Sequence, residues 1–418
     1  MASSGKIVEV IFENAIKTHE EQMQMLPLVD IFKPNSANMQ NSGNYVWQTV
    51  QQNRPIIEGW DLEGLETDII EETYPAFLGV PKNDFFEQRA DDLRDEQFWK
   101  RAGEESGKRQ VSELNKATAN VVTQQGSLYY ESATGSGYEF VAEAQALLKE
   151  RQASAEDCSF ILNDRSNLKF GSELAGRQTL QGRPEKTWAT GQIGQNIAEF
   201  DVYTGSFLSN VAAKSGGDTT VTADVSEKPE GGTVGAANVV TNVDYRVGTI
   251  PVASSANYQV GDVVGFAGVE SLGLQDKTQT GQQMTFRVVS IPDGTTLEVF
   301  PKPIAQDDPA LSVLEKSYAN INTQIASGAD VVKLNDNGGK SNIFFAKNSI
   351  EVLGGDAPLS LLNQFGGMKV ISSTMSNGQT MYMAYDGNID KLTFKCRLFT
   401  WWGVTNVNPS ANGVAISI

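Results

Sequence analysis

The longest helical stretch of the sequence runs from Asp91 to Gln125 and reads DDLRDEQFWKRAGEESGKRQVSELNKATANVVTQQ. Most of its apolar side chains recur at intervals of three to five residues, with one longer gap between Ala102 and Val111, a pattern typical of an α-helix with one apolar face. They are Leu93, Phe98, Ala102, Val111, Leu114, Ala117 or Thr118, and Val121 or Val122. Acidic residues at the start offset the helix dipole, and Gly126 ends the pattern. The sequence therefore predicts one long helix as its principal α element.

Two glycines, Gly103 and Gly107, interrupt this helix on neighbouring turns. A glycine inside a helix costs up to about 1 kcal/mol relative to alanine, because its backbone loses more conformational freedom. Their positions mark a candidate hinge at which the helix could bend. The alternative is that they are small residues tolerated on an exposed or tightly packed face.

The N-terminal residues 6–26 have the pattern of an amphipathic helix that ends before Pro27. The apolar stripe consists of Ile7, Val10, Ile11 and Ala15. A helix of this length is marginal alone in water, so the stripe should pack against its own domain or against a neighbouring molecule. The polar run that contains His19 is predicted to form the exposed face of this helix.

A strand is predicted from Tyr45 to Val50, and residues 53–77 then mix many charges with scattered Ile, Leu and Trp. We expect an extended loop or a two-stranded ribbon, which is barely stable by itself in water. Such a loop is explained if it lies across an adjacent subunit; the alternative is a solvated surface loop. The residues predicted to make contacts between subunits are Arg54, Glu58, Trp60 and Asp61.

The composition changes after about residue 210, where Gly, Thr, Val and Ser become frequent. Phe286–Ile291 and Thr296–Phe300 flank a Pro-Asp-Gly-Thr sequence typical of a β-hairpin turn. Tyr138–Gln152 predicts a second helix before this region, and Cys396–Val404 predicts a buried strand after it. The sequence therefore predicts an α+β fold with an inserted all-β module.

Charge and composition restrict the class of protein. The 33 Lys and Arg against 51 Asp and Glu give a net charge of −18, which argues against tight, sequence-independent binding of nucleic-acid phosphates. The sequence has no run of roughly 20 consecutive apolar residues, which a membrane-spanning helix would need. We therefore expect a soluble protein without a secretion signal. Cys158 and Cys396 form no C-x-x-C motif and are expected to be reduced thiols.

The sequence contains no recognisable catalytic set. Zinc sites, Ser-His-Asp triads and Cys-His pairs need an imidazole beside other functional groups, and His19 is the single histidine. Asp307 and Asp308 are paired acids, but they are expected to cap a helix over residues 310–319. We therefore predict no catalytic residue, no cofactor and no metal.

Several segments resemble the coat proteins of P22-like tailed phages, in the same order and at similar separations. They are Glu58–Leu62, Asn83–Phe86 with Arg89–Glu96, Phe266–Val269, Pro301–Pro303, Tyr318–Asn320 and Cys396–Arg397. The match over residues 83–96 is the most specific. The resemblance spans nearly the whole chain, with a poor match from Ser154 to Val240.

The resemblance implies the HK97 capsid fold: an N-terminal arm, an extended loop, a peripheral domain with a spine helix, and an axial domain interrupted by an inserted Greek-key β-barrel. The arm would comprise residues 1–31 and the extended loop 53–78. The peripheral domain would comprise residues 32–52, 79–126 and 393–418, with the spine helix at about 91–125. The axial domain would comprise residues 127–211 and 339–392, and the insertion domain residues 212–338.

The same resemblance implies a structural subunit that is not an enzyme. Such subunits form pentamers and hexamers of themselves around a scaffolding protein, with a portal protein at one vertex and no membrane. The shell expands when double-stranded DNA is packaged, and its inner face then lies loosely near the DNA. A bend at Gly103 and Gly107 would give the spine helix room to straighten. The expected location is the virion capsid, assembled in the cytoplasm of the host bacterium.

Two further positions concern partners. Glu13 falls where the P22 branch has an acid that meets basic side chains of the scaffolding protein, but Asn14 stands where that branch has a second acid. The alternative for Glu13 is an exposed helix residue without a partner. The protruding loop of the family corresponds to Lys228–Asp244, which is poorer in charge here than the resemblance implies.

Two other classes of protein stay open. A β-rich phage tail or carbohydrate-binding protein would explain the composition of residues 211–300. It would not explain the long helix beside an acidic loop, and such proteins usually contain repeats, which we do not find. An enzyme that uses only carboxylates, such as a glycosidase, is compatible with the 51 acidic residues.

Overall fold

The computed structural model divides the chain into two compact units. Unit 1 comprises Met1–Val46, Ala76–Thr118 and Glu351–Thr405, and unit 2 comprises Trp47–Pro75, Ala119–Ile350 and Asn406–Ile418. The residues that the structure describes are 4–32, 44–51, 60–61, 63, 70–89, 95–132, 137–153, 157–169, 194–230, 233–234, 240–241, 244–355, 369–376, 378–388 and 390–418.

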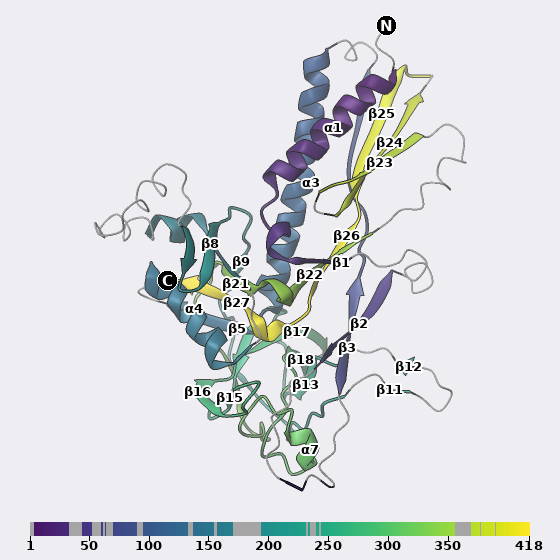
Figure 1. Cartoon of the computed structure of the whole chain (residues 1–418). Coiled ribbons are helices and arrows are strands. Elements are labelled where there is room, and N and C mark those ends of the chain that lie inside the picture. The colour runs from purple at the N-terminus through teal and green to yellow at the C-terminus, as the bar shows by residue number, and fades with distance from the viewer. Residues whose placement is uncertain are drawn as a thin grey trace. The chain divides into compact units, whose positions relative to one another are not determined.

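Unit 1 is built from a four-stranded antiparallel sheet and two helices (Figure 1). The helices are α1 (Ser4–Gln22) and α3 (Glu96–Gln125), whose last residues belong to unit 2. The strands follow the order β23 (Lys369–Thr374), β24 (Thr380–Asn388), β25 (Thr393–Thr400) and β4 (Lys82–Arg89). Alternate side chains of a strand point to opposite faces, so one face of the sheet packs on the helices. Its residues include Phe86, Met381, Met383, Cys396 and Leu398.

The two helices approach closely where α3 has glycines. A Cβ atom at Gly107 would lie 2.5 Å from the carbonyl oxygen of Ala15, and one at Gly103 would collide with the carbonyl oxygen of Ile11. Both contact points advance by four residues along their helices, which is the ridge spacing of closely packed helices. The glycines therefore lie on a tightly packed face, and the absence of their side chains lets α1 reach α3.

The prediction that His19 is exposed is wrong, because its side chain is only 1% exposed. His19 follows Ala15 by four residues and so continues the buried stripe of α1. Thr18 is buried as well and lies beside Gly107. The prediction relied on the polar character of residues 17–22. The helical spacing nevertheless places Thr18 and His19 on the inner face of the helix.

Smaller elements complete unit 1 and begin the loop region. The helical turn η1 (Leu26–Leu28) precedes β1 (Asp30–Phe32), which pairs in parallel with β22 (Ile350–Gly354) in a three-stranded sheet with β26 (Trp402–Asn406). β2 (Tyr45–Gln51) and β3 (Glu71–Phe77) form a two-stranded ribbon. The strand predicted over residues 396–404 is divided between β25 and β26, which are separated at Trp401.

Unit 2 contains two six-stranded sheets. The first has the order β5 (Leu128–Ser132), β27 (Asn412–Ser417), β21 (Asn342–Ala346), β6 (Cys158–Leu162), β8 (Phe200–Thr204) and β7 (Gly194–Ile197). Helix α4 (Tyr138–Glu150) buries Phe140 and Leu148 in the core of this sheet. Phe160 and Phe344 stack there with their ring centroids 6.0 Å apart, so large aromatic surfaces supply much of the buried area. Two helical turns, η3 (Lys347–Ser349) and η4 (Pro409–Ala411), lie between strands.

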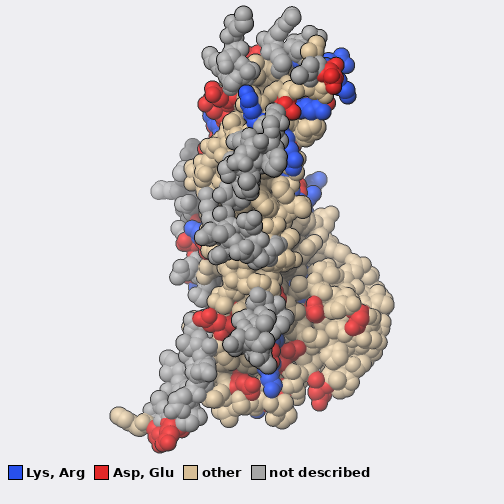
Figure 2. All heavy atoms as spheres, turned by 90° about the vertical axis from the view of Figure 1, so that its right-hand side faces the viewer, with Lys and Arg blue, Asp and Glu red and all other residues tan. Residues whose placement is uncertain are grey.

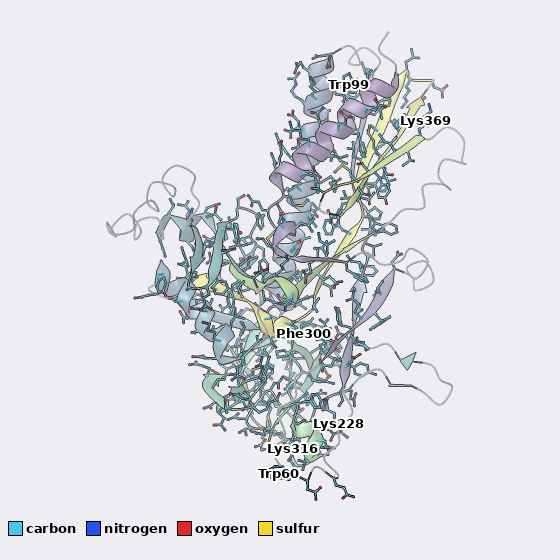
Figure 3. All side chains as sticks on the ribbon, viewed as in Figure 1. Trp60, Trp99, Lys228, Phe300, Lys316 and Lys369 are labelled. Carbon is cyan, nitrogen blue, oxygen red and sulfur yellow. The ribbon has the colours of Figure 1, made fainter. Side chains whose placement is uncertain are left out.

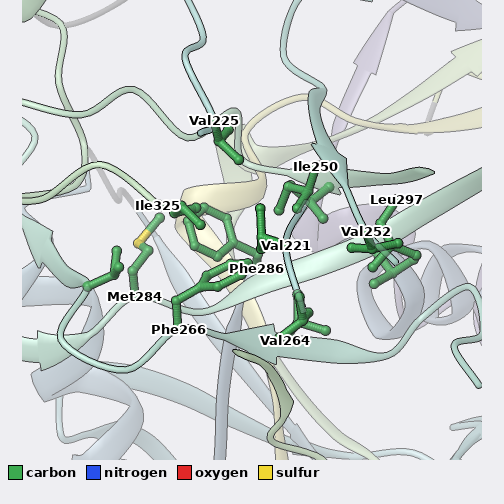
Figure 4. Close-up of a cluster of buried hydrophobic side chains, with 14 of the residues drawn as sticks. Val221, Val225, Ile250, Val252, Val264, Phe266, Met284, Phe286, Leu297 and Ile325 are labelled. Atoms are coloured by element: carbon green, nitrogen blue, oxygen red, sulfur yellow. The ribbon is translucent and has the colours of Figure 1, made fainter. Parts of the chain in front are cut away.

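The second sheet lies within residues 212–338, which we call the insertion segment. Its order is β10 (Thr219–Thr220), β19 (Asp330–Lys333), β14 (Val263–Gly265), β17 (Phe286–Asp293), β18 (Thr296–Phe300) and β13 (Gly248–Pro251). β17 and β18 form the hairpin that the sequence predicts. Phe266 and Phe286 meet edge to face in the core, with ring centroids 5.8 Å apart (Figure 4).

The ends of the insertion segment lie together, because β9 (Asn210–Val211) pairs with β20 (Gly339–Lys340). Two further pairs are β11 (Thr233–Val234) with β12 (Val240–Thr241), and β15 (Glu270–Leu272) with β16 (Gln279–Gln283). The chain thus enters and leaves the segment at one place. Closure of the sheet into a Greek-key barrel stays a prediction.

The sheets divide the chain differently from the expected domains at two places. β23 and β24, expected in the axial domain, belong to one sheet with β25 and β4 in unit 1, in which β24 pairs with β25 and β25 pairs with β4. Residues 412–417, expected in the peripheral domain, lie between β5 and β21 in unit 2. β27 is buried along nearly its whole length, as a central strand must be. The other domain limits stay predictions.

The helix expected over residues 310–319 is limited to α7 (Val313–Lys316). Ser312 caps it, because its Oγ accepts from the backbone N of Glu315 at 3.3 Å while the Glu315 carboxylate accepts from the backbone N of Ser312 at 2.8 Å. This reciprocal capping box defines the start of the helix. Asp308 instead accepts from the backbone N of Ala310 at 2.8 Å in the preceding turn.

We expect Gly107→Ala to lower the free energy of unfolding of the monomer by roughly 1–3 kcal/mol, because the added methyl group collides with the backbone of α1. An unpacked glycine in a helix would give the opposite sign, a gain of up to about 1 kcal/mol. Urea unfolding measures this difference. Ser112→Ala on the exposed face of α3 is the control and should change stability by less than about 0.5 kcal/mol. A stabilised Gly107→Ala variant would contradict the packing explanation.

Candidate subunit-contact surfaces

Helix α1 buries its apolar stripe on its own unit and turns Glu13 outward. Val8, Ile11, Phe12 and Ala15 lie in one buried cluster with Trp99 of α3. This is the first of the two alternatives for the stripe. Glu13 is exposed, whereas the neighbouring Asn14 is half-buried and its Nδ2 donates to the carbonyl oxygen of Val10 at 2.6 Å. Glu13 is therefore accessible to a partner, while the Asn14 amide is engaged within the helix.

The C-terminal end of α1 is held by polar groups of unit 1. Glu20 accepts from the backbone N of Ser376 at 2.7 Å, and this hydrogen bond lowers the pKa of Glu20. Burial lowers the pKa of His19 from 6.5 to about 4, and the nearby charge of Glu20 opposes this effect. Within the described residues, Nδ1 of His19 has no hydrogen-bond partner. The imidazole is therefore neutral at pH 7 and its protonation disfavours the packed arm.

The structure describes only part of the predicted intersubunit loop. Arg54 and Glu58 lie outside the described residues. Trp60 is 107% exposed, and Figure 3 draws it at the lower edge of the view. Asp61 is also exposed, and its carboxylate accepts from the backbone N of Glu63 at 3.1 Å. Because tryptophan is enriched at the energetic centres of protein interfaces, Trp60 is the strongest candidate contact of this loop.

The base of the ribbon carries an aromatic pair that the spacing of residues along the chain does not reveal. The rings of Tyr45 in β2 and Phe77 in β3 have their centroids 4.7 Å apart, and their side chains are 42% and 45% exposed. Tyr45 is the first residue of β2 and Phe77 is the last residue of β3. At the end of a strand, the alternation of polar and apolar residues does not show to which face of the sheet a side chain points. Only the pairing of the two strands brings the rings together and leaves them partly in water.

The candidate hinge residues Gly103 and Gly107 lie inside one continuous helix. Both face α1 at van der Waals distance or closer, so any bend of α3 at this point must also displace the arm. The hinge stays a prediction. The geometry adds that bending and arm packing involve the same residues.

The titratable groups of the described residues bear on metal binding and on thiol chemistry. No three His, Cys, Asp or Glu side chains within the described ranges are placed to hold a metal ion. A cavity of about 270 Å³ lies beside Cys158, but burial raises the pKa of this thiol to about 11. Burial raises the pKa of Cys396 as well. Both thiols are therefore protonated at neutral pH and are poor nucleophiles.

The surface of the insertion segment is acidic. The segment contains fifteen Asp and Glu against eight Lys and Arg. Four of the eight cations are buried: Arg246, Arg287, Lys302 and Lys333. On the face in Figure 2, acidic groups are scattered over the lower part, with few basic groups among them. Such a surface repels the phosphates of nucleic acid.

None of the helices in the described part of the chain has the length and apolar character needed to span a bilayer. Among the exposed groups of the described residues, three are candidates for contact: the outward acid of α1, the exposed tryptophan of the loop and the aromatic pair at its base. They lie on separate elements of the chain, α1, the loop and the two strands of the ribbon.

Comparison with known families decides what these surfaces belong to. The sequence model of the family described as P22 coat protein, gene protein 5, matches residues 1–417. The chain belongs to the P22 coat protein family. Its α+β structure, with an arm, a long helix and a two-stranded ribbon, is consistent with the HK97-like capsid fold.

Solved structures similar to this P22-family coat protein include structures from other phages. The structure titled Mycobacterium phage Che8 is 10% identical, covers 94% of this chain and 91% of its own, and has a TM-score of 0.43. The head structure of Helicobacter pylori bacteriophage KHP40 is 8% identical over 93% and 87% of the chains, with a TM-score of 0.41. The CUS-3 coat protein I-domain is 34% identical over 29% of this chain and 98% of its own, with a TM-score of 0.23. The family match, and not these likenesses, carries the assignment.

We expect the free energy of unfolding of this coat protein to fall by roughly 3 kcal/mol more than that of His19→Gln as the pH is lowered from 6.5 to 4. The unfolded chain binds a proton at His19 in this interval, whereas the folded chain with its lowered pKa does not. The stabilisation is complete above pH 6.5 and is lost as the pH falls toward 4. Urea unfolding at several pH values measures it. Parallel pH profiles of the two proteins would show that His19 does not titrate as described.

Proposed function

We propose that this chain is the major capsid subunit of a tailed phage and assembles with a scaffolding protein into a closed icosahedral shell of pentamers and hexamers. The observation that carries the proposal is the family match over residues 1–417. Family membership makes the chain a coat protein, whose copies associate in a shell. The scaffolding protein, the portal protein at one vertex, and the assembly in the bacterial cytoplasm are the proposed parts.

The exposed surfaces support assembly through many weak contacts. The apolar stripe of α1 is buried within the subunit. Near the loop, the large apolar side chains that are exposed are Trp60, Tyr45 and Phe77. Each such contact contributes little alone, but contacts made together in a closed shell reinforce one another. A subunit that is bound incorrectly early in assembly can then dissociate, because few contacts hold it.

Two partners are proposed from charge. Glu13 is exposed and would meet basic side chains of the scaffolding protein. Packaged double-stranded DNA would lie only loosely near the inner face, because the chain has a net charge of −18. Expansion during packaging would be a rearrangement of rigid bodies. In this rearrangement α3 would change from a helix bent at Gly103 and Gly107 to a straight helix.

Electron microscopy of the protein co-expressed with the scaffolding protein of its phage tests this function. We expect closed, uniform shells with pentameric and hexameric clusters. Soluble monomers or fibres under all conditions would favour the β-rich tail or carbohydrate-binding alternative. Hydrolysis of a glycan by the purified monomer would instead favour the carboxylate enzyme.

We expect Trp60→Ala to leave the folded monomer unchanged but to raise the protein concentration needed for assembly about fivefold or more, because a tryptophan at the centre of a contact contributes more than 1 kcal/mol. Light scattering during assembly with scaffolding protein measures the threshold. Leu168→Ala is the control, since Leu168 is also exposed in unit 2. An equal threshold for both variants would remove Trp60 from the contact.

A further inference from the structure

Arg246 joins three parts of unit 2 that are far apart in the sequence. Its guanidinium carbon lies 4.4 Å from the ring centroid of Tyr74 in β3 and 5.1 Å from that of Phe300 in β18. Its Nη1 donates to the carbonyl oxygens of Asn406 and Val407. The side chain is only 7% exposed, so these contacts are largely shielded from water. One side chain thus connects the base of the extended loop, the insertion segment and the C-terminal part of the chain.

Asp244 fixes the orientation of this guanidinium. One carboxylate oxygen accepts from Nε of Arg246 at 3.0 Å and the other accepts from Nη2 at 2.9 Å. Such a two-point pair holds the planar group in one plane, so that its faces meet the rings and its free edge meets the carbonyl oxygens. A lysine keeps the charge but has neither the fork nor the flat faces. The arrangement therefore depends on arginine and not on positive charge alone.

The insertion segment also holds β3 through the backbone. The N–H of Tyr245 donates to the carbonyl oxygen of Thr73 at 3.1 Å, and the N–H of Ile70 donates to the hydroxyl of Tyr318 at 3.3 Å. Ile70 packs against the buried cluster of Leu272, Ile304, Leu311, Tyr318 and Ala319. β3 is in turn connected to β2, because the hydroxyl of Tyr74 in β3 donates to the side-chain oxygen of Gln48 in β2 at 2.8 Å.

We propose that Arg246 is a positioning residue for the extended loop: it holds β3 on the insertion segment, so that the loop is oriented before a second copy of the chain arrives. The proposal rests on the proposed shell function, since it assigns a task to the loop in contacts between copies. A pre-oriented loop loses less conformational freedom when it docks, and association is favoured accordingly. The insertion segment and the base of the loop then move as one body.

Hydrogen exchange of the monomer, read by mass spectrometry, tests the positioning directly. In Arg246→Lys we expect the amides of residues 70–77 to exchange about tenfold faster or more, because local opening becomes easier. The amides of residues 286–300 in the core of the insertion segment should change by less than about twofold. In assembly with scaffolding protein, the yield of shells should fall at least about fivefold.

The matched control is Arg287→Lys, which alters another buried arginine of the same segment. Nε of Arg287 donates to the carbonyl oxygen of Gly126 at 2.9 Å and Nη1 to that of Gly261 at 2.6 Å, away from β3. We expect this variant to leave the exchange of residues 70–77 unchanged. Equal acceleration in both variants, or none in Arg246→Lys, overturns the proposal.

A second variant covers the case in which Arg246→Lys does not fold. Tyr74→Leu removes the ring from the loop side and leaves the insertion segment intact. Relative to the wild type, the amides of residues 70–77 should again exchange faster, and those of residues 286–300 should not. Unchanged exchange in Tyr74→Leu overturns the proposal as well. If the wild-type protein forms no shells while the exchange differences are found, the shell function fails but the positioning by Arg246 stands.

Discussion

The arm of this coat protein can bury its apolar stripe only because α3 has no side chain at Gly103 and Gly107. The carbonyl oxygens of Ile11 and Ala15 occupy the space that Cβ atoms would need. This approach brings the stripe of α1 into the same buried cluster as Trp99 and one face of the four-stranded sheet. It also takes His19 out of water, which keeps the imidazole neutral. The conformational cost of glycine in a helix is thus offset by close packing, and any bend of α3 is mechanically tied to the arm.

A second constraint is that buried cations need acceptors, because an unpaired buried charge is strongly destabilising. In the insertion segment these acceptors are mostly backbone carbonyl groups. Lys333 donates to the carbonyl oxygen of Ser215 at 2.6 Å, Lys302 to that of Lys228 at 2.9 Å, and Arg287 to that of Gly126 at 2.9 Å. These bonds connect stretches that are distant in sequence without using many carboxylates. Most acids of the segment therefore remain at least partly exposed, although Asp262 and Asp308 are buried.

Family membership says that copies of this chain meet, and the geometry separates the residues used inside the subunit from those left for neighbours. The apolar stripe of α1, His19 and the two glycines are used inside. Glu13, Trp60 and the ring pair of Tyr45 and Phe77 are left outside. The outward groups lie on the arm and the ribbon, whose other residues, such as Ile11 and Tyr74, are buried in the subunit. Arg246 is the clearest example of such a hold, because its contacts reach both the ribbon and the insertion segment.

By itself, the sequence determined the elements whose pattern is local: the helix that became Glu96–Gln125, the helix Tyr138–Glu150 and the hairpin of β17 and β18. Its ordered motifs also indicated the family that the match over residues 1–417 establishes. Tertiary structure alone decided that His19 is buried and that the glycines of α3 face the arm. It also decided that β24 pairs with β25, and β27 with β5, across the expected domain limits. It also decided that Arg246 meets Tyr74 and Asn406. The reason is physical: side-chain spacing is a property of neighbours along the chain, whereas burial and hydrogen-bond partners depend on residues hundreds of positions away.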